Sequence, residues 1–257
     1  MFIKRIALFS LIITTPVFAR VIKTEKISTV CKEVKKYHKQ ITKNVSKKKK
    51  LMVIFDIDNT LAEPDNLDQY GSDQWLQTHV ERIVEKGVPT VKAWDIMLPL
   101  WFEIQKDPKF SLRPIEKNTV EIFKDIQKLS DKTIGLTARS FPILSDTLRL
   151  LKHVGINFLD NGFTEDFMFD GVPGEYTHGI FFCGTGDKGE SLLELFARLN
   201  YYPDIIIFVD DKEKNVQSVE KAALLKNIEF LGIHYTHLAK KVKNFRLHPE
   251  IHNFTTA

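Results

Sequence analysis

Cysteine is almost absent from this chain of 257 residues, which contains only Cys31 and Cys183. The two stand far apart in the sequence, and neither lies in a spacing that zinc sites use for their ligands. An oxidising compartment would permit a disulfide, but no pattern in the sequence brings the two thiols together. We therefore expect two unpaired, partly buried thiols and no zinc site.

A strong surplus of one charge is also lacking, because 37 lysines and arginines stand against 33 acids. Loss of residues 1–19 would remove Lys4 and Arg5 and no acid, which leaves 35 bases against the same 33 acids. This near balance argues against a general nucleic-acid binder. The one basic block, residues 47–50, is more typical of a solvated helix end or linker than of a patch that binds phosphate or lipid.

Long apolar runs are missing except near the N-terminus. Residues 6–13 are almost wholly apolar, follow the basic Lys4 and Arg5, and precede small residues that end at Ala19. This pattern is typical of a secretory signal peptide. The alternative, an uncleaved membrane anchor, is disfavoured because a bilayer span takes about 20 apolar residues. We predict cleavage after Ala19, a periplasmic or secreted protein, and no stable membrane insertion after cleavage.

Short apolar runs alternate with amphipathic segments along the rest of the chain. We expect strands at residues 51–55, 133–137, 204–209 and 228–235, and shorter strands and turns within 156–183. We expect helices at residues 22–46, 73–106, 115–129, 143–154, 188–199 and 212–225, with Pro89 and Pro99 interrupting the second. This alternation predicts an α/β protein, a Rossmann-like three-layer sandwich with a mainly parallel sheet.

The spacing of the strands leaves room for an insertion. Between residue 56, at the end of the first expected strand, and residue 137, at the end of the second, lie more residues than one loop and helix require. We predict a signal peptide (1–19), an N-terminal helical segment (20–50), a core (51–64 and 114–257) and a small helical cap (65–113) inserted after the first strand. The final twenty residues are polar, and the pattern assigns them no element.

Tryptophan occurs only in the predicted cap, as Trp75, Trp94 and Trp101, with Phe102 beside the last. Such rings could stack on a nucleobase or another flat group. Large aromatic side chains more often form the core of the element that carries them. We therefore expect these residues to form the cap's own core.

Polar side chains follow three of the expected strands at their carboxyl ends: Asp56 and Asp58 after the first, Thr137 at the end of the second and Asp210 after the third. In open parallel sheets ligands bind at this edge. Two carboxylates one residue apart repel each other, and a hard cation such as Mg²⁺ relieves that repulsion. The same ion can bridge the protein to a phosphoryl group.

Other interpretations of Asp56 and Asp58 compete with this one. A calcium loop of the EF-hand type is rejected, because Leu61 stands where glycine is required and Leu67 stands where the bidentate glutamate is required. A turn with only a structural role is compatible with aspartate and asparagine at these positions. A carboxylate pair for glycoside hydrolysis is compatible with the spacing as well.

Four short motifs, taken in order, resemble those of the haloacid dehalogenase superfamily in its phosphatase branch. The first is the run DIDNTL at residues 56–61, the second is Thr137, the third is Lys188 at the start of a helix, and the fourth is Asp210-Asp211. The resemblance covers about residues 51–235. The chain is also similar to a domain-of-unknown-function branch with exported members.

The resemblance implies a Mg²⁺-dependent phosphomonoester hydrolase that acts on a small phosphorylated substrate. Asp56 would attack phosphorus and form an aspartyl-phosphate. Asp58, protonated beforehand, would give its proton to the leaving oxygen and later take one from water. Thr137 would donate a hydrogen bond to a phosphoryl oxygen, although it could be an ordinary strand-end hydroxyl. Lys188 would neutralise charge on the nucleophile and the phosphoryl group.

The resemblance also implies that Asp56, the backbone carbonyl of Asp58, and Asp210 hold Mg²⁺, with Asp211 binding directly or through water. Many members place a further acid a few residues after the fourth motif. This chain has lysine and asparagine at residues 214–215. The adjacent pair Asp210-Asp211 can supply the acids instead.

Several of these assignments have alternatives. Lys132 and Lys212 also lie near strand or helix ends, and a lysine at a helix start is often only a solvated side chain. We prefer Lys188 because anion sites often lie at helix N-termini. Asp211 could be the N-cap of the next helix. Arg139 could reach a phosphate or lie on the surface.

Three other functions would use related sites. A phosphotransferase would use the same residues, and a catalytically degenerate protein would only bind phosphate or a partner. A dehalogenase would not require Asp58, since a departing halide needs no proton. The presence of both Asp56 and Asp58 favours a phosphatase that is still active.

Overall fold

One large sheet forms the centre of the computed structural model, which describes residues 18–43, 49–169 and 174–247. Its strands are β1 (Ala19–Thr24), β2 (Leu51–Phe55), β5 (Lys132–Thr137), β6 (Phe167–Met168), β7 (Glu175–Thr177), β8 (Ile180–Phe182), β9 (Ile205–Asp210) and β10 (Glu229–Tyr235). They lie in the order β1-β10-β9-β2-β5-β8-β7-β6. The neighbours from β1 to β8 are parallel, and β8-β7-β6 are antiparallel. The predicted α/β class with a mainly parallel sheet is confirmed.

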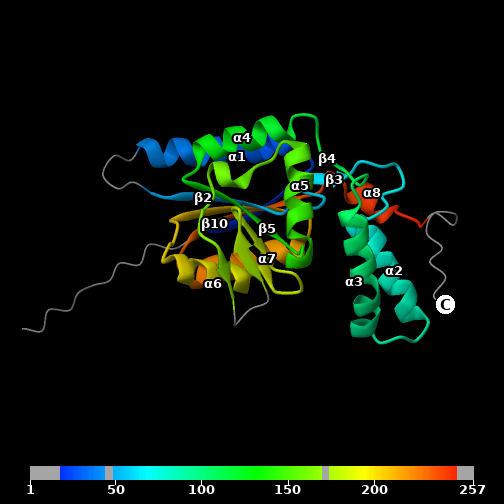
Figure 1. Cartoon of the computed structure of the whole chain (residues 1–257). Coiled ribbons are helices and arrows are strands. Elements are labelled where there is room, and N and C mark those ends of the chain that lie inside the picture. The colour runs from blue at the N-terminus through cyan, green and yellow to red at the C-terminus, as the bar shows by residue number, and fades with distance from the viewer. Residues whose placement is uncertain (1–17, 44–48, 170–173, 248–257) are drawn as a thin grey trace, which may run out of the picture.

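Helices cover both faces of this sheet (Figure 1). One face packs against α1 (Ile27–Lys43), α4 (Thr119–Leu129) and α5 (Leu144–Val154), and the other against α6 (Lys188–Leu199) and α7 (Glu213–Leu225). Strand β2 shows why the sequence specifies this arrangement. Its alternate residues belong to different cores, Val53 and Phe55 to one and Met52 and Ile54 to the other. A strand buried on both faces must be apolar throughout, as β2 is.

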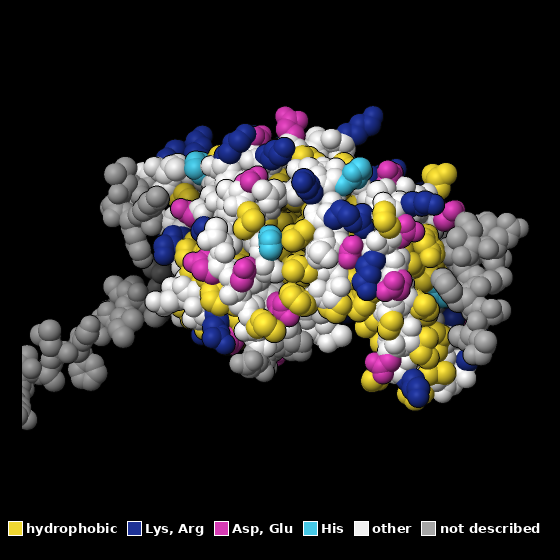
Figure 2. Space-filling model, in the orientation of Figure 1, with side chains coloured by type: hydrophobic (Ala, Val, Ile, Leu, Met, Phe, Trp, Pro, Cys, Tyr) yellow, Lys and Arg dark blue, Asp and Glu magenta, His cyan; other side chains and the backbone are white. Residues whose placement is uncertain are grey.

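The predicted cap region forms a helical hairpin beside the sheet. Strand β3 (Ala62–Pro64) pairs with β4 (Leu112–Pro114) in a two-stranded antiparallel ribbon, and α2 (Asp73–Glu85) and α3 (Thr90–Lys106) lie between them in the sequence. Figure 1 shows the two helices standing apart from the sheet. Figure 2 shows hydrophobic side chains gathered over this hairpin. Pro89 precedes α3 as expected, but Pro99 lies inside α3 and does not end it.

The N-terminal segment differs from the prediction. Residues 20–24 were expected within a helical segment, but they form β1, which pairs with β10 at the edge of the sheet, and α1 begins only at Ile27. The run ARVIKT has the valine and isoleucine of a strand, and its one neighbour supplies the hydrogen bonds that a lone strand lacks. The predicted cleavage after Ala19 would start the mature chain inside β1. Residues 1–17 lie outside the described residues.

Several smaller predictions have clear outcomes. Cys31 and Cys183 are unpaired, as expected, and both are fully buried. Gly155 ends α5 in the left-handed conformation expected of a C-cap. The C-terminal part contains one short helix, α8 (Ala239–Lys243). Lys49, from the basic block, pairs with Glu229 at 3.6 Å. Among the residues that the structure describes, no helix combines the length and apolarity needed to cross a membrane.

Candidate active site

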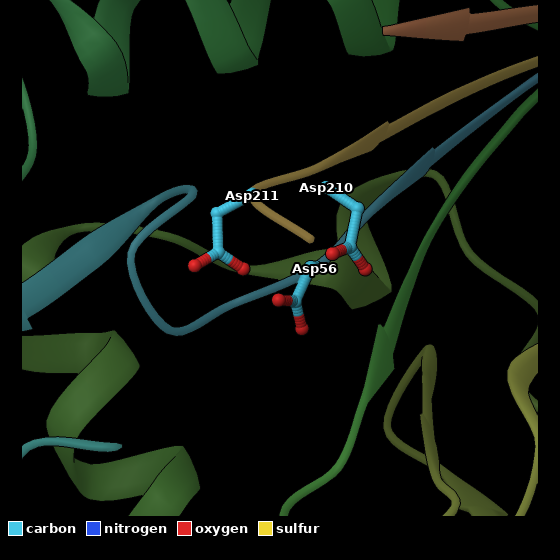
Figure 3. Close-up of side chains that lie close together, drawn as sticks. All are labelled: Asp56, Asp210 and Asp211. Atoms are coloured by element: carbon cyan, nitrogen blue, oxygen red, sulfur yellow. The ribbon is translucent and has the colours of Figure 1, made fainter. Parts of the chain in front are cut away.

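Three aspartate carboxylates meet at the carboxyl edge of the sheet. Asp56 follows β2, and its backbone N–H donates to Val209 in the adjacent strand β9 at 2.9 Å. Asp210 ends β9 and Asp211 follows it. One carboxylate oxygen from each of the three lies within 4.8 Å of the others. Figure 3 shows Asp56 and Asp210 on neighbouring strands with Asp211 beside them. The sheet order, with β9 next to β2, brings these distant residues together.

A tight turn after Asp56 places Asp58 beside the same edge. The N–H of Leu61 donates to the carbonyl of Ile57 at 2.9 Å, and the N–H of Asn59 donates to the carbonyl of Ala62 at 2.9 Å. Asn59 has φ of 60°, a left-handed conformation that asparagine adopts more readily than most residues. The turn therefore reverses the chain at once, and the residues DIDNTL are suited to it.

Lys188 connects two of the three carboxylates. Its Nζ lies 2.8 Å from Asp56 and 2.7 Å from Asp210, and the lysine side chain is only 4% exposed. Lys188 is the first residue of α6, which packs closely on α7 at this end. A Cβ on Gly189 would lie 2.5 Å from the carbonyl oxygen of Ser218. Glycine at residue 189 thus allows the close helix contact that brings the lysine over the strand ends.

The other two lysines considered from the sequence point elsewhere. Lys132 donates to the carbonyl of Gly162 at 2.8 Å and makes no contact with the aspartates. Lys212 forms an ion pair at 2.9 Å with Asp73, the first residue of the cap helix α2. The structure therefore brings Lys188, and neither of the alternatives, to the candidate nucleophile. The Lys212–Asp73 pair instead ties the cap to the core.

Arg139 is not a surface residue, because it is buried and lines the cavity. Its Nε and Nη2 each donate to one oxygen of Asp58 at 2.8 Å. Its Nη1 donates to Thr147 at 3.3 Å, and its guanidinium lies 5.4 Å from the ring centre of Trp101 in the cap. Only 1% of the Arg139 side chain is exposed. Both oxygens of Asp58 are therefore occupied by a bidentate pair with a buried arginine.

Thr137 lies at the end of β5, beside a cavity of about 320 Å³ above the strand ends. Its hydroxyl oxygen accepts a hydrogen bond from the N–H of Arg139 at 3.1 Å. Because that oxygen already accepts, its own hydrogen is directed elsewhere and is available to an acceptor in the cavity. Asp56, Asp58 and Lys188 line the same cavity.

Burial dominates the electrostatics of the aspartates. It raises the pKa of Asp56 to about 7, an effect that Lys188 opposes and Asp210 reinforces. Burial also raises the pKa of Asp211, with Asp56 adding to the effect. Burial acts to lower the pKa of Lys188, but the adjacent Asp210 and Asp56 carboxylates outweigh it and raise that pKa. Lys188 is therefore a permanent cation, whereas the aspartates lack sufficient positive charge around them.

The excess of negative charge at this site fits a divalent metal ion. The cluster combines the four carboxylates of Asp56, Asp58, Asp210 and Asp211 with the two cations of Lys188 and Arg139, leaving two negative charges in excess. Lys212 is already neutralised by Asp73. A doubly charged cation would cancel this excess, and carboxylate oxygens are the ligands that Mg²⁺ prefers.

The hydrogen bonds of the carboxylates indicate which of them could hold the ion. Asp211 Oδ1 is buried and has no hydrogen-bond partner among the described residues. The oxygens of Asp210 already accept from Lys188, from the N–H of Lys212 and from the amide of Asn215. Asp211 therefore has a vacant ligand atom. It is not the N-cap of α7, which begins after Lys212.

The sequence comparisons identify a family. A family model described as "Protein of unknown function (DUF2608)" matches residues 28–257. The chain belongs to the DUF2608 family. The DUF2608 chain is 26% identical over 223 residues to a protein of Chlamydia pneumoniae whose name contains "Putative outer membrane protein", a match that covers 86% of this chain and 79% of that one. A protein of Chlamydia trachomatis serovar D with that name is 24% identical over 186 residues, covering 72% and 68%.

A solved structure also matches the DUF2608 chain at a distance. It is a hydrolase of the haloacid dehalogenase-like family from Streptococcus pneumoniae, with 13% identity and a TM-score of 0.42, and the match covers 76% of this chain and 98% of that one. Similarity of this size establishes neither fold nor function. The predicted relation to a domain-of-unknown-function branch is confirmed by the family match, and the names of the relatives agree with the prediction of export.

Two functional contacts were not foreseen from the sequence of the DUF2608 chain. The pairing of Arg139 with Asp58 had one available signal, because Arg139 follows strand-end Thr137 by two residues and so lies at the same edge. The contact between Lys212 and Asp73 had none. It depends on how the cap helices fold back over the sheet, which no local pattern specifies.

Proposed function

We propose that this DUF2608 protein is a Mg²⁺-dependent phosphomonoester hydrolase that acts through an aspartyl-phosphate on Asp56. The observation that carries the proposal is the buried bridge from Lys188 to Asp56 and Asp210. It supplies a fixed positive charge beside a strand-end carboxylate, which is what an incoming phosphoryl group requires. The order of the haloacid dehalogenase motifs in the sequence supports the same function.

The reaction proceeds in two displacements. An oxygen of Asp56 forms a bond to phosphorus as the bond from phosphorus to the leaving oxygen breaks. Water then attacks the aspartyl-phosphate, releasing inorganic phosphate and restoring Asp56. Lys188 and the hydroxyl of Thr137 stabilise the charge that develops on the phosphoryl oxygens. Asp56, Asp210, Asp211 and the carbonyl of Asp58 would hold Mg²⁺, and the bound ion would supply further positive charge for these oxygens.

Asp58 protonates the leaving oxygen, and this role requires a change at Arg139. Both oxygens of Asp58 accept hydrogen bonds from Arg139 in the structure. At least one must be released before the carboxyl group can carry and donate a proton. A phosphoryl group is a competing partner, since guanidinium forms bidentate hydrogen bonds with phosphate as well as with carboxylate. Substrate binding in the adjacent cavity thus provides a means of freeing Asp58.

A catalytically degenerate phosphate-binding protein is the main alternative, and the charge of the cluster opposes it. With Lys188 and Arg139 counted, the cluster still has two negative charges in excess, which repel a phosphate group unless a metal cation is bound. A protein that only binds phosphate gains nothing from retaining them. Nothing in the geometry favours a phosphotransferase over a hydrolase.

We place the enzyme outside the cytoplasm, periplasmic or secreted, on the strength of residues 1–19. N-terminal sequencing of the mature protein checks the expected cleavage after Ala19.

The proposal is tested by the hydrolysis of p-nitrophenyl phosphate with Mg²⁺ and with EDTA. We expect turnover only with the metal. Asp56→Asn should lower kcat by about three orders of magnitude or more, because no carboxylate remains to attack phosphorus. Asp68→Asn is the matched control, since Asp68 is an exposed acid that does not line the cavity. Equal rates for Asp56→Asn and the unaltered protein, or no metal-dependent hydrolysis across a broad phosphate panel, would refute the function.

A further inference from the structure

The cavity above the aspartates has two chemically different sides. The side formed by the core is polar and contains the acids, the hydroxyl and the cations of the site. The side formed by the cap is mainly apolar: the residues there are Leu76, Trp94, Leu98 and Trp101, with Asp73 and Gln77 as the polar members. A phosphomonoester is divided in the same way, with a charged phosphoryl end and a leaving group of variable polarity.

Three of the apolar residues form one stripe along the cap helix α3. Trp94, Leu98 and Trp101 are spaced by four and three residues, which places them on the same helix face. Trp101 is 4% exposed and fixed, because its indole N–H donates to the carbonyl of Gly71 at 2.8 Å and its ring faces Arg139. Trp94 and Leu98 are only half-buried. They are therefore the members of the stripe with surface left for a ligand.

The polar cap residues that line the cavity are already engaged. Asp73 forms its ion pair with Lys212 at 2.9 Å, and the amide of Gln77 donates to Glu81 at 3.1 Å. A leaving group rich in hydroxyls would lose hydrogen bonds to water on this side, where, among the described residues, Asp73 and Gln77 are the only polar cap side chains that line the cavity and each already has a partner. Such unmatched desolvation weakens binding. An apolar leaving group incurs no such cost and gains by covering Trp94 and Leu98.

We infer that Trp94 and Leu98 form a leaving-group subsite, and that this protein acts on phosphomonoesters of apolar alcohols or phenols. The inference rests on the proposed function, which supplies the phosphoryl end of the ligand. The volume, about 320 Å³, is at the lower end of the range for small-molecule sites, roughly 300–1,000 Å³. It accommodates a phosphoryl group with one ring or a short alkyl chain.

Binding of phosphonates tests the subsite without requiring turnover. Phenylphosphonate and methylphosphonate share the charged end, carry a carbon–phosphorus bond that the proposed reaction does not cleave, and differ in apolar surface. With Mg²⁺ present, calorimetry should give a Kd for phenylphosphonate about tenfold or more below that for methylphosphonate, since the ring covers the stripe. Trp94→Ala and Leu98→Gln should each reduce that ratio severalfold. Ile96→Ala should preserve it, because Ile96 lies on the exposed surface of α3 and does not line the cavity.

Hydrolysis supplies the second readout. Butyl phosphate and glycerol phosphate are both alkyl esters of similar intrinsic reactivity, so their kcat/KM ratio reports mainly the fit of the leaving group. We expect a preference for butyl phosphate that falls in Leu98→Gln and persists in Ile96→Ala. Leu98→Gln keeps nearly the length of the side chain, so it tests polarity without opening a large cavity, and its thermal unfolding is measured alongside.

The outcomes separate the two proposals. If both phosphonates bind with the same Kd, or if glycerol phosphate is preferred, the apolar subsite is wrong while hydrolysis that depends on Asp56 still supports the phosphatase. If neither phosphonate binds in the presence of Mg²⁺ and no ester is hydrolysed, the phosphoryl site itself is wrong and the subsite falls with it. A ratio that Ile96→Ala reduces as much as Trp94→Ala would also overturn the assignment.

Discussion

The strand ends and the cap hairpin enclose one cavity, but their ion pairs differ in how far they are exposed to solvent. At the strand ends, Lys188 and Asp210 are 4% and 0% exposed and are tightly paired. Between cap and core, the Asp73–Lys212 pair is 26% and 40% exposed. Breaking a buried pair costs roughly 3–5 kcal/mol, whereas an exposed pair contributes roughly 0–1 kcal/mol. The ion pair at the strand ends therefore contributes strongly to holding the reactive geometry, whereas the ion pair between cap and core contributes little to holding the cap in place.

The largest effect is expected from Lys188→Met. It leaves Asp56 and Asp210 buried without their shared cation, so the free energy of unfolding should fall by roughly 3–5 kcal/mol without metal, and kcat should fall by about two orders of magnitude or more. Chemical denaturation and steady-state kinetics measure both. Lys132→Met is the control, because Lys132 begins β5, does not line the cavity, and contacts the carbonyl of Gly162 and the ring of Phe163. Comparable losses of stability and kcat in the two variants would contradict the role given to Lys188 as the shared cation of Asp56 and Asp210.

The next largest effect is expected from Arg139→Gln, which removes both hydrogen bonds from Arg139 to Asp58. We expect a loss of about 2–4 kcal/mol in the free energy of unfolding, less than for Lys188 because Asp58 is 15% exposed. Adding Asp58→Asn to Arg139→Gln should recover part of the loss, since no unpaired carboxylate then remains. Additive losses in this double-mutant cycle would show that the pair is not coupled.

A third prediction concerns pH. The pKa of Asp56 is raised by burial to about 7, well above the ordinary aspartate value of about 4. The native state therefore binds this proton more tightly than the unfolded chain, so without metal the contribution of Asp56 to stability is present in acid and is lost as pH rises through about 7. Mg²⁺ and this proton would compete for the carboxylate of Asp56.

The rise in Tm caused by saturating Mg²⁺ should consequently be larger near pH 8 than near pH 5.5, by an amount equivalent to about 2 kcal/mol. Thermal unfolding with Mg²⁺ or EDTA at the two pH values measures it. In Asp56→Asn the difference between the two pH values should shrink. An equal Mg²⁺ effect at both would contradict a metal site that contains Asp56.

The smallest effect is expected from Asp73→Asn at the cap. The free energy of unfolding should change by about 1 kcal/mol or less, because the ion pair with Lys212 is part-exposed and solvent-screened. The effect on KM should exceed the effect on kcat, since the pair positions the cap and not the reacting groups. A large loss of kcat at unchanged KM would show that Asp73 acts on the reacting groups as the strand-end residues do. It would contradict the difference in role between the two ion pairs.

The parts of the site that follow strands could be predicted from the sequence. Residues 51–55 and 205–209 are continuous apolar runs. A parallel sheet aligns the ends of such runs, so Asp56 and Asp210 had to share one edge. Lys188 was harder to predict, because a lysine at a helix start carries no local sign of burial. Its position depends on the close packing of α6 on α7 at Gly189.

The remaining features depend on long-range contacts that a local pattern does not record. Strand β1 consists of six residues, half of them polar or charged, and it is stable only because β10 lies beside it. The β3–β4 ribbon pairs segments on either side of the whole cap. Arg139 looked like a surface residue or a phosphate ligand because its partner, Asp58, lies on another strand's loop.

Strand β1 pairs with β10, so the first strand within the described residues is held by the last one there, and residues 25–228 separate them. During synthesis the edge strand emerges long before the strand that completes its hydrogen bonds. A chain on its way across a membrane would therefore stay without its finished sheet until almost all of it had been made. The order of the strands delays closure of the fold, and in an exported protein this delay would lengthen the time in which the chain can cross a membrane unfolded.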